Sequence, residues 1–390
     1  MIFADSKALT FGMELELQIV NKETGKLSPS SLEIWREASL RNDAERFSME
    51  ATQATIELNT SIHSSADTML EETLHLVATL RNIAAASGVD IRGGGTQVNQ
   101  FWNDRVLSPT ARAVELSTKF GFLPKRFSTY GMHVHIGVPS GDAAIHLANS
   151  LQALCPLFIA MSAASPLLQM TDTGFCAARP LEPLVYPHGG PMPRLGSWAE
   201  FESIASEIFS TGLADSLKDI YWDVRPKPEF GTVEVRVFDT PMSVYKAVAM
   251  AAFTRACAAL VLDGTLSLPV ATNPYSTSRV SRFVACRDGM DAKLFNPFEG
   301  RWLPALEWLR NLFDAVGTSP LCESDAQHIK SLETLWMPLQ DCDIMRRAWA
   351  RIVAAHPLES DATAALSEYS KVVCAHLLQD RDGSQSVRSN

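Results

Sequence analysis

Four segments of the chain alternate between apolar and polar residues with the two-residue period of a β-strand. They span residues 11–20, 55–60, 131–138 and 230–239. In the first segment, Met13, Leu15 and Leu17 share one face, and Glu14 and Glu16 share the other. One apolar and one polar face are typical of antiparallel strands that cover a core on one side only.

Elsewhere the apolar residues recur at the spacing of helices. Between residues 65 and 86 a helix is predicted from Met69, Leu70, Leu74, Val77 and Leu80. Further helices are predicted over 108–120, 142–165 and 198–208, and a long, ordered loop rich in Pro and Gly over 171–198. The stretch VDIRGGGTQV predicts a short strand that runs into a glycine turn. After residue 239 the chain is expected to be mainly helical to about residue 378 and frayed over 379–390.

The order of these elements favours an α+β fold over a doubly wound α/β fold, because strands with inserted helices come first and a helical half follows. We expect a single catalytic domain over residues 1–378. Its sheet-bearing part spans about residues 9–240, and its mainly helical part spans about residues 241–378.

The overall charge argues against two classes of partner. The formal net charge is −10 at pH 7, which disfavours nucleic acid and anionic membranes as main partners. An anionic small substrate stays open, because a bound cation can reverse the local sign of the charge.

The start of the chain and its cysteines point to the cytoplasm. No basic segment followed by an apolar one occurs in MIFADSKALTFG, so no signal peptide is expected. The seven cysteines are widely spaced and include no CxxC pair, which favours reduced thiols over a disulfide framework. Residues 147–170 carry no charge, but Asn149, Gln152 and Pro156 interrupt them, so we expect a buried core helix and no membrane span.

The polar faces of the four predicted strands carry an unusual set of side chains. They are Glu14 and Glu16, then Glu57, then His133 and His135, then Glu234 and Arg236. Neighbours on one strand face lie roughly 7 Å apart, and two carboxylates at that distance repel by about 2–3 kcal/mol at an effective dielectric of about 20. A divalent cation removes this repulsion. Carboxylates with one or two imidazoles suit Mg²⁺ or Mn²⁺ better than zinc.

Each of these patterns is weak by itself. A lone ELE is more often a solvated strand face, and a lone HVH occurs in metallohydrolases and in satisfied cores alike. Their coincidence on successive strands favours a cation site. The sequence has no P-loop, dinucleotide-binding or nucleophile-elbow motif. A polar sheet face with several Mg²⁺ ions can nevertheless hold a triphosphate, with Arg236 as a bidentate fork for the transferred group.

Two other activities fit the same residues. A guanidino-kinase-type phosphotransferase uses a related sheet and moves phosphate to a guanidinium group. A metal-dependent hydrolase would use His133, His135 and Glu234 around a zinc-activated water. The residue pattern alone leaves both open.

Several motifs, in their order along the chain, resemble one known family. They are FGMELELQIV, EATQATIELNT, GGGTQ, YGMHVHIGVPSGD, SAASP, YWDVRPKPEFGTVEVRVFDTP and RFVACRDG. Over about residues 9–375 the chain resembles the YbdK-type carboxylate–amine ligases, also called glutamate–cysteine ligase type 2, and more remotely glutamine synthetase. The resemblance implies a glutamine synthetase/guanidino kinase-like fold. In that fold a curved, mainly antiparallel sheet is flanked by helices and binds ATP and Mg²⁺ on its concave face.

The resemblance also implies a reaction. A substrate carboxylate attacks the γ-phosphate of ATP to form an acyl phosphate, and an amine then displaces phosphate to leave an amide and ADP. The nominal substrates are L-glutamate, through its γ-carboxyl group, and L-cysteine, although no residue identifies the true amine. Because relatives tend to form dimers, a homodimer is expected from the resemblance alone.

Site residues follow from the same resemblance. The implied metal ligands are Glu14, Glu16, Glu57, His133 and Glu234. Arg236 is implied to stabilise charge on the transferred phosphoryl group, and His135 to approach the nucleotide. Glu50 falls where relatives place an acid near the same cations, and we assign it a catalytic role. Glu50 and Glu57 are seven residues apart, so a bend or bulge between them is required.

Further residues are candidates for contact with the substrates. Arg179, in the loop rich in Pro and Gly, is expected to reach phosphate or substrate, and Trp222 with Arg225 to clamp a substrate carboxylate. For both arginines a structural ion pair is the alternative. Thr96, which follows the glycine run, is expected to line the substrate pocket. The cysteines are expected in the core, with Cys286 as the one candidate exception.

Overall fold

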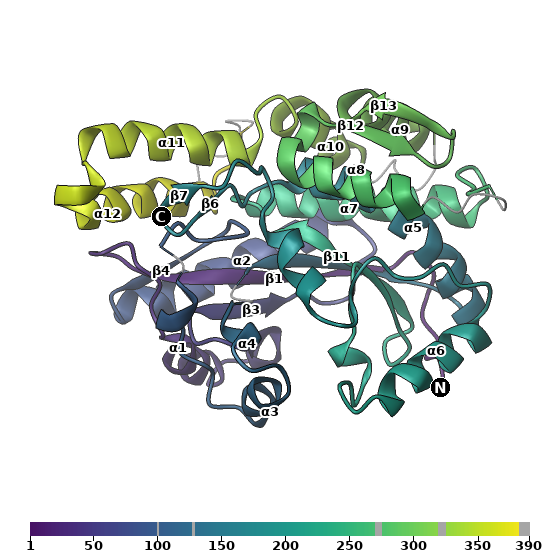
Figure 1. The fold of residues 1–390 in the computed structure, drawn as a ribbon, viewed down its shortest axis with the longest axis horizontal. Helices are drawn as coiled ribbons and strands as arrows, with labels where there is room; N and C mark the ends of the chain where they lie inside the picture. Colours follow the sequence, from purple (N-terminus) through teal and green to yellow (C-terminus); the bar gives the residue numbers. More distant parts are fainter. Residues whose placement is uncertain (100, 127–128, 270–274, 319–324, 382–390) are drawn as a thin grey trace.

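The structure is a computed structural model of the 390-residue chain. It describes residues 1–99, 101–126, 129–269, 275–318 and 325–381. The frayed tail predicted over 379–390 therefore lies outside the described residues from 382 onward. Figure 1 shows a central sheet with helical layers on one side and smaller helices on the other.

A seven-stranded sheet forms the centre of the fold. Its strands pair in the order β10-β11-β5-β1-β3-β2, and β4 pairs with the second half of β1. All of these pairings are antiparallel, so the predicted α+β class with a mainly antiparallel sheet is confirmed. The strands are β1 (Phe11–Asn21), β2 (Phe47–Met49), β3 (Thr55–Asn59), β4 (Val89–Arg92), β5 (Gly131–Gly137), β10 (Val224–Lys227) and β11 (Thr232–Asp239).

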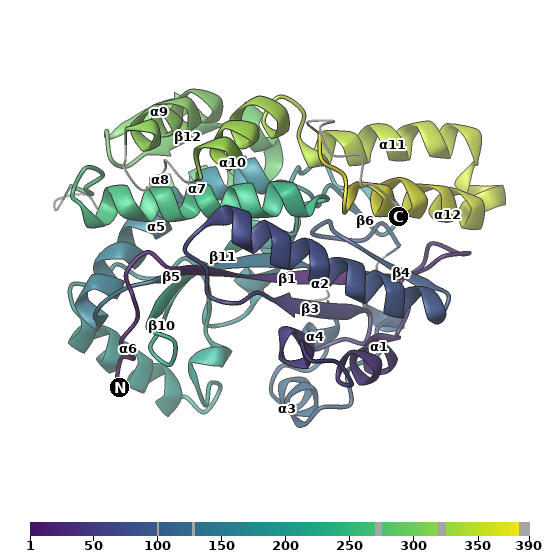
Figure 2. The ribbon, with the colours of Figure 1, turned by 180° about the vertical axis from the view of Figure 1, so that it is seen from behind.

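Three long helices pack on the apolar side of this sheet (Figure 2). They are α2 (Ala66–Ala86), α5 (Gly141–Ser162) and α7 (Val244–Leu262). Each begins after a serine whose hydroxyl accepts a backbone N–H of the first turn. Beneath the helices, Met13, Leu15 and Leu17 are at most 1% exposed. The alternation along β1 therefore separates the core from the polar face.

Both α5 and α7 are long and apolar enough to cross a membrane by length and composition alone. Within their most apolar windows, however, 78% and 94% of the residues are buried inside the fold. Both helices are therefore core helices of this domain, as expected for the uncharged stretch over residues 147–170. α5 ends at Ser162, a few residues earlier than the sequence predicts.

The C-terminal part of the chain forms an outer layer over these helices (Figure 2). Its helices are α8 (Tyr275–Asp288), α9 (Ala305–Gly317), α10 (Ala326–Ser331), α11 (Asp341–Ala355) and α12 (Leu358–His376), with a π-helical turn at Leu332–Trp336. A hairpin of β12 (Lys293–Asn296) and β13 (Arg301–Pro304) interrupts them. α8 packs on α5, and α9 and α10 pack on α7.

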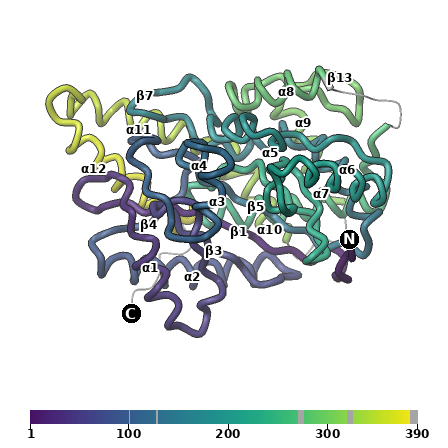
Figure 3. The backbone as a smooth tube through the Cα atoms, turned by 60° about the horizontal axis from the view of Figure 1, so that its bottom comes forward, coloured from purple at the N-terminus to yellow at the C-terminus, as the bar shows by residue number. Residues whose placement is uncertain are grey.

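Shorter elements stand around the edges of the sheet. The helices are α1 (Ser31–Ala38), α3 (Ala111–Phe120), α4 (Leu123–Arg126) and α6 (Trp198–Ser210). In Figure 3, α3 and α4 lie to one side of β1 and β5, and α6 lies to the other. Two-residue strands pair as β6 (Leu167–Leu168) with β7 (Thr171–Asp172) and as β8 (Gly189–Gly190) with β9 (Tyr221–Trp222). Single 3₁₀ turns stand at Ala44–Arg46, Trp102–Asp104, Arg179–Val185, Leu217–Asp219 and Gly289–Asp291.

The sequence analysis missed β2, β10 and the β12–β13 hairpin. β2 has only three residues, too few for a visible period. β10 contains Pro226 and lies at the edge of the sheet, where a strand tolerates proline. The loop predicted over 171–198 is ordered around the 3₁₀ turn at Arg179–Val185.

The glycine run packs the end of β4 against the end of β11. A side chain at Gly93 would place its Cβ 1.9 Å from the carbonyl oxygen of Pro241. A Cβ at Gly95 would lie 2.5 Å from the carboxyl carbon of Asp239. Gly94 has φ +102°, a conformation that favours glycine. The absence of side chains in this run therefore allows the two backbone segments to approach each other closely.

Gly93→Ala is expected to lower the free energy of unfolding by about 2–3 kcal/mol, because the added methyl group meets a backbone carbonyl. Urea denaturation followed by circular dichroism measures this loss. Gly317→Ala is the matched control, since Gly317 ends α9 and a Cβ there would meet nothing within 4 Å. The control is expected to be neutral or slightly stabilising, and equal stability of the two variants would contradict the packing argument.

Candidate active site

Cross-strand pairing brings the ionisable residues of the polar face together. The opposite pairs are Glu14 with His133, Glu16 with Glu57, and Glu234 with His135. Side chains that lie opposite each other on antiparallel strands have Cβ atoms about 4.5–5.5 Å apart, so their polar ends meet. They form two groups of possible metal ligands.

The first group joins β1, β5 and β11. Glu14 Oε2 lies 2.7 Å from His133 Nδ1, and Glu14 Oε1 lies 3.1 Å from His135 Nε2. Glu234 Oε1 is 3.7 Å from His133 Nδ1 and 3.9 Å from His135 Nε2. Burial would raise the pKa of Glu14, but its hydrogen bonds to both histidines hold that pKa well below its usual range. Ligand atoms of Glu14, His135 and Glu234 lie within 4.8 Å of one another, close enough to hold one cation.

His133 has the features of a metal ligand. Because Nδ1 faces a carboxylate, the ring proton belongs on Nδ1 and leaves a lone pair on Nε2. That Nε2 atom is buried and has no hydrogen-bond partner among the described residues. Burial and the nearby Arg236 lower the pKa of His133, which keeps the imidazole neutral. The donor set of carboxylate oxygens and imidazole nitrogen fits Mg²⁺ or Mn²⁺.

The second group consists of Glu16, Glu50 and Glu57, whose ligand atoms also lie within 4.8 Å of one another. Burial and the neighbouring Glu16 raise the pKa of Glu50 to about 7. Burial and Glu50 raise the pKa of Glu57 well above its usual value. The three carboxylates therefore repel one another when no cation is bound, and three carboxylates are a donor set that Mg²⁺ accepts.

Glu50 reaches this group through a reversal of the chain. It follows Met49, the last residue of β2, and β2 pairs antiparallel with β3. After the turn, Glu57 stands on β3 beside it. The bend that the sequence requires is thus a turn between two strands, not a bulge within one strand. This turn is why a separation of seven residues still places both glutamates on the same side.

Glu234 differs from the other carboxylates because arginines surround it. Arg225 Nε and Nη2 lie 2.9 and 2.8 Å from Glu234 Oε2, and Arg236 Nη1 contacts Oε1. Burial would raise the pKa of Glu234, but Arg225 and Arg236 outweigh it and hold the pKa well below its usual range. Glu234 is therefore a buried counter-charge for two arginines, unlike the crowded carboxylates of the second group.

Arg236 and Arg179 stand beside these groups. Arg236 Nη1 lies 3.4 Å from His133 Nδ1. Burial disfavours its charge, but Glu234 and Glu14 outweigh that effect and raise the pKa of Arg236. Arg179 Nη1 donates to the carbonyl oxygen of Arg236 at 3.3 Å. Its Nε–H is buried and has no hydrogen-bond partner among the described residues.

Three other candidate residues, Arg225, Trp222 and Cys286, have contacts or burial that indicate a structural role. Arg225 donates from Nη1 to two backbone carbonyl oxygens, at 2.7 and 2.8 Å, in addition to its contact with Glu234. It is thus the structural ion pair that the sequence left open. Trp222 is 5% exposed in the core and contacts the Phe201 ring, so these two residues do not form a clamp. Burial raises the pKa of Cys286 to about 12, which keeps its thiol protonated.

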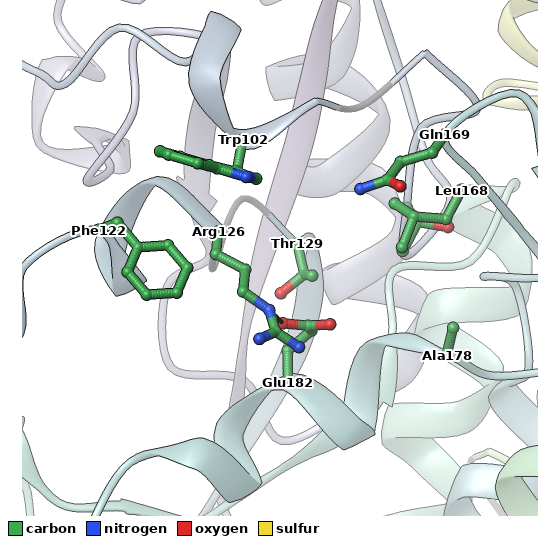
Figure 4. Close-up of a pocket in the computed structure, with 9 residues that line it drawn as sticks. Trp102, Phe122, Arg126, Thr129, Leu168, Gln169, Ala178 and Glu182 are labelled. Carbon is green, nitrogen blue, oxygen red and sulfur yellow. Dashed lines mark hydrogen bonds and ion pairs between the residues drawn. The ribbon is translucent and has the colours of Figure 1, made fainter.

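Thr96 lines a cavity. Figure 4 shows other residues of its wall. The cavity has a volume of about 280 Å³. Its lining residues are Thr96, Trp102, Phe122, Arg126, Thr129, Leu168, Gln169, Ala178 and Glu182. Thr129 lies two residues before Gly131, whose N–H donates to Glu16 Oε2. Of the lining residues the sequence points only to Thr96, because the others stand on separate turns and short helices with no common period.

Sequence comparisons identify one family. Residues 10–340 match the family model described as "Glutamate-cysteine ligase family 2(GCS2)". A protein of Bordetella petrii named "Putative glutamate--cysteine ligase 2" is 38% identical over 315 residues, which cover 80% of this chain and 75% of that protein. A protein of the same name from Cupriavidus metallidurans is 36% identical over 333 residues, covering 85% and 88%.

Solved structures share the fold at low sequence identity. A glutamate–cysteine ligase from Francisella tularensis in complex with AMP has a TM-score of 0.66 at 14% identity, covering 95% of this chain and 90% of that chain. A bifunctional glutathione synthetase from Pasteurella multocida has a TM-score of 0.62 at 15% identity, covering 95% and 52%. This likeness bears out the fold predicted from the motifs.

In metal-free buffer, Glu50→Gln is expected to become more stable than the wild type as the pH rises. A folded-state pKa of about 7, above the usual 4.5, means that Glu50 stabilises the fold below pH 4.5 and that this contribution is lost as the pH rises to about 7. Thermal unfolding in EDTA at pH 5 and pH 8 measures the difference. His133, whose lowered pKa acts in the opposite direction, is present in both proteins and cancels.

Mg²⁺ is expected to reverse this order at pH 8, because the ion binds the ionised carboxylates. The wild type should gain a few degrees of melting temperature, and Glu50→Gln should gain less. A difference between the proteins that does not change with pH would contradict the crowding of the second group.

Glu57→Gln and Glu234→Gln are expected to change stability in opposite directions in metal-free buffer at pH 8. The first removes a repelled carboxylate and should raise the melting temperature. The second leaves Arg225 and Arg236 without their counter-charge and should cost about 3–5 kcal/mol. Thermal and urea unfolding measure both, and a stabilising Glu234→Gln would show that the arginines do not depend on it.

Proposed function

The chain belongs to glutamate–cysteine ligase family 2, and we propose that it joins the γ-carboxyl group of glutamate, or of a similar acid, to an amine. Membership of the family makes the chain an ATP-dependent carboxylate–amine ligase. Its relatives bear the name of a glutamate–cysteine ligase, so glutamate and cysteine are the nominal substrates. The acyl-phosphate route, the metal and the residue roles below are parts of the proposal.

One observation carries the proposal: two groups of cation ligands lie on one face of the sheet, with Arg236 against the first. Glu14, His135 and Glu234 would hold one ion, and Glu16, Glu50 and Glu57 a second. The lone pair of His133 Nε2 lies on the side of the second ion, 3.8 Å from Glu16 Oε1. Mg²⁺ held by these residues would supply positive charge to neutralise the phosphate oxygens of ATP.

The proposed reaction has two steps. First, an oxygen of the substrate carboxylate bonds to the γ-phosphorus of ATP, the bond from that phosphorus to the bridging oxygen breaks, and ADP leaves. Second, the amine nitrogen bonds to the acyl carbon, the bond from that carbon to the phosphate oxygen breaks, and phosphate leaves. The amine loses one proton for each amide formed.

The side chains of the site have distinct roles in these steps. Arg236, held by Glu234, offers N–H donors to the transferred phosphoryl group. His135 is oriented by Glu14 at Nε2 and by the Thr232 hydroxyl 3.1 Å from Nδ1, and faces the nucleotide side. Arg179, which donates to the backbone carbonyl of Arg236, is the candidate for contact with phosphate or substrate. Glu50, on the turn after β2, would help to hold the second ion beside the reacting groups.

The two alternative activities have less support. A guanidino phosphotransferase would leave a stable phosphorylated product, and a hydrolase would need no ATP. The family groups this chain with ligases. The second group also consists of carboxylates alone, whereas structural and catalytic zinc sites draw mainly on His and Cys.

Product analysis tests the proposal. The purified chain is incubated with ATP, Mg²⁺, glutamate and single amines, and ADP, phosphate and products are measured by coupled assay and mass spectrometry. Equal amounts of ADP, phosphate and amide support the ligase. A phosphorylated product without free phosphate, or turnover without ATP, would refute it. If cysteine gives no more turnover than other amino acids, the nominal amine is wrong and the ligase stands.

Arg236→Lys is expected to lower kcat by about 100-fold while the KM for ATP changes less than about threefold, because a point charge cannot replace the guanidinium fork in the transition state. Steady-state phosphate release measures both constants, and the melting temperature checks the fold. A rise in KM as large as the fall in kcat would assign Arg236 to simple ATP binding.

A further inference from the structure

We propose that the cavity walled by Trp102, Phe122 and Leu168 receives the amine, and that it selects amines with an apolar or aromatic body over cysteine. This inference rests on the ligase function proposed above and adds the chemical class of the acceptor. It is carried by the size of the cavity, its aromatic wall, its neutralised charges and its position.

The cavity is much larger than a cysteine side chain. Its volume is about 280 Å³, nearly twice the roughly 150 Å³ of a protein cavity that binds benzene. A methylene group with a thiol fills only a small part of this space. Atoms that line an unfilled cavity lose dispersion contacts, so a larger apolar body gains more on binding.

Two aromatic side chains form an uncovered wall of the cavity. Trp102 is 44% exposed and Phe122 is 48% exposed, and their rings meet edge-on with centroids 5.3 Å apart. Figure 4 shows both rings facing the same space, with Leu168 across from them. These rings expose apolar surface to water. An apolar ligand that covers this surface would therefore bind favourably.

The two charged residues of the cavity neutralise each other. Arg126 Nε donates to Glu182 Oε2 at 2.9 Å, which links α4 to the 3₁₀ turn that also carries Arg179. Among the lining residues no unpaired cation is left for the α-carboxylate of an amino acid such as cysteine. The cavity thus suits an amine whose body is uncharged.

Gln169 is held toward the cavity by a strained turn. β6 and β7 are joined by Gln169 and Met170, which have φ +51° and +63°. A non-glycine residue in this region costs about 1–2 kcal/mol, and such strain gathers at ligand sites. In Figure 4 the Gln169 amide and the Thr129 hydroxyl point into the space. They can accept hydrogen bonds from the amine nitrogen.

The position of the cavity connects it to the proposed chemistry. On one wall, Thr129 lies two residues from Gly131, whose N–H donates to Glu16. On another wall, Ala178 precedes Arg179, which donates to the backbone of Arg236. Two residues of extended chain span about 7 Å. An amine with its body in the cavity can therefore reach the face on which the acyl phosphate is proposed to form.

A panel of primary amines of graded apolar size tests the selectivity. Methylamine, ethanolamine, cysteine, isobutylamine and 2-phenylethylamine are each offered to the full chain with ATP, Mg²⁺ and glutamate, and the amide is measured by mass spectrometry. We expect kcat/KM for 2-phenylethylamine to exceed that for cysteine at least tenfold. An equal or lower value would overturn the inference and leave the ligase function standing.

Truncation of the aromatic wall is expected to act on the large amines. Trp102→Ala should raise the KM for 2-phenylethylamine about tenfold and that for methylamine less than twofold, and Phe122→Ala should act likewise. The matched control is Trp302→Ala, which removes a tryptophan that is 38% exposed and edge-on to Phe295 at 5.7 Å. Trp302 lies in the β12–β13 hairpin of the outer layer, far from α4 (Figure 1). The control should leave both KM values unchanged.

Binding without chemistry separates failure of this inference from failure of the ligase function. If no acid and amine turn over, calorimetric titration of the wild type, Trp102→Ala and Trp302→Ala with 2-phenylethylamine reports directly on the cavity. Binding that is lost only in Trp102→Ala supports the pocket, and no binding to the wild type overturns it. If apolar acids instead of amines accelerate phosphate release and Trp102→Ala abolishes this effect, the cavity serves the acid and the inference is wrong.

Discussion

Repulsion among Glu16, Glu50 and Glu57 is the constraint on which the candidate site depends. Their ligand atoms lie within 4.8 Å of one another, and burial together with their mutual charge raises the pKa of Glu50 and of Glu57. The first group is different, because the protein itself compensates Glu14 with two histidines and Glu234 with two arginines. Of the two candidate cation sites, the first is thus electrostatically balanced by the protein, and the second would gain most from an ion.

A rigid support is needed to hold carboxylates that repel. The apolar faces of the same strands supply it, since they are sealed under α2, α5 and α7 and have almost no exposed surface. Backbone pairing then fixes the register, and a shift by one residue would turn every ligand into the core. The cost of crowding the acids is offset by burial on the opposite side of the same strands.

The proposed phosphate-binding face and the proposed amine cavity are built from different kinds of structural element. Arg236 and the candidate cation ligands other than Glu50 stand on paired strands, where the register of the sheet fixes their positions. The cavity is walled by turns and short helices, which carry Trp102, Phe122 and Gln169. Loops tolerate change better than strands do. A shared phosphate chemistry with a variable acceptor is the expected result of this division.

The sequence by itself determined the strands, their two faces and the residue types of the cation site, because a period of two and the choice of Glu, His and Arg are local properties of the chain. It also identified the family, since whole motifs are preserved in order. Only the tertiary structure decided which carboxylates are crowded and which are paired. Glu50 joins its group through a turn, Glu234 is held by Arg225, and the aromatic cavity is assembled from separate turns. Such facts depend on contacts between residues far apart in the chain, and no local pattern records them.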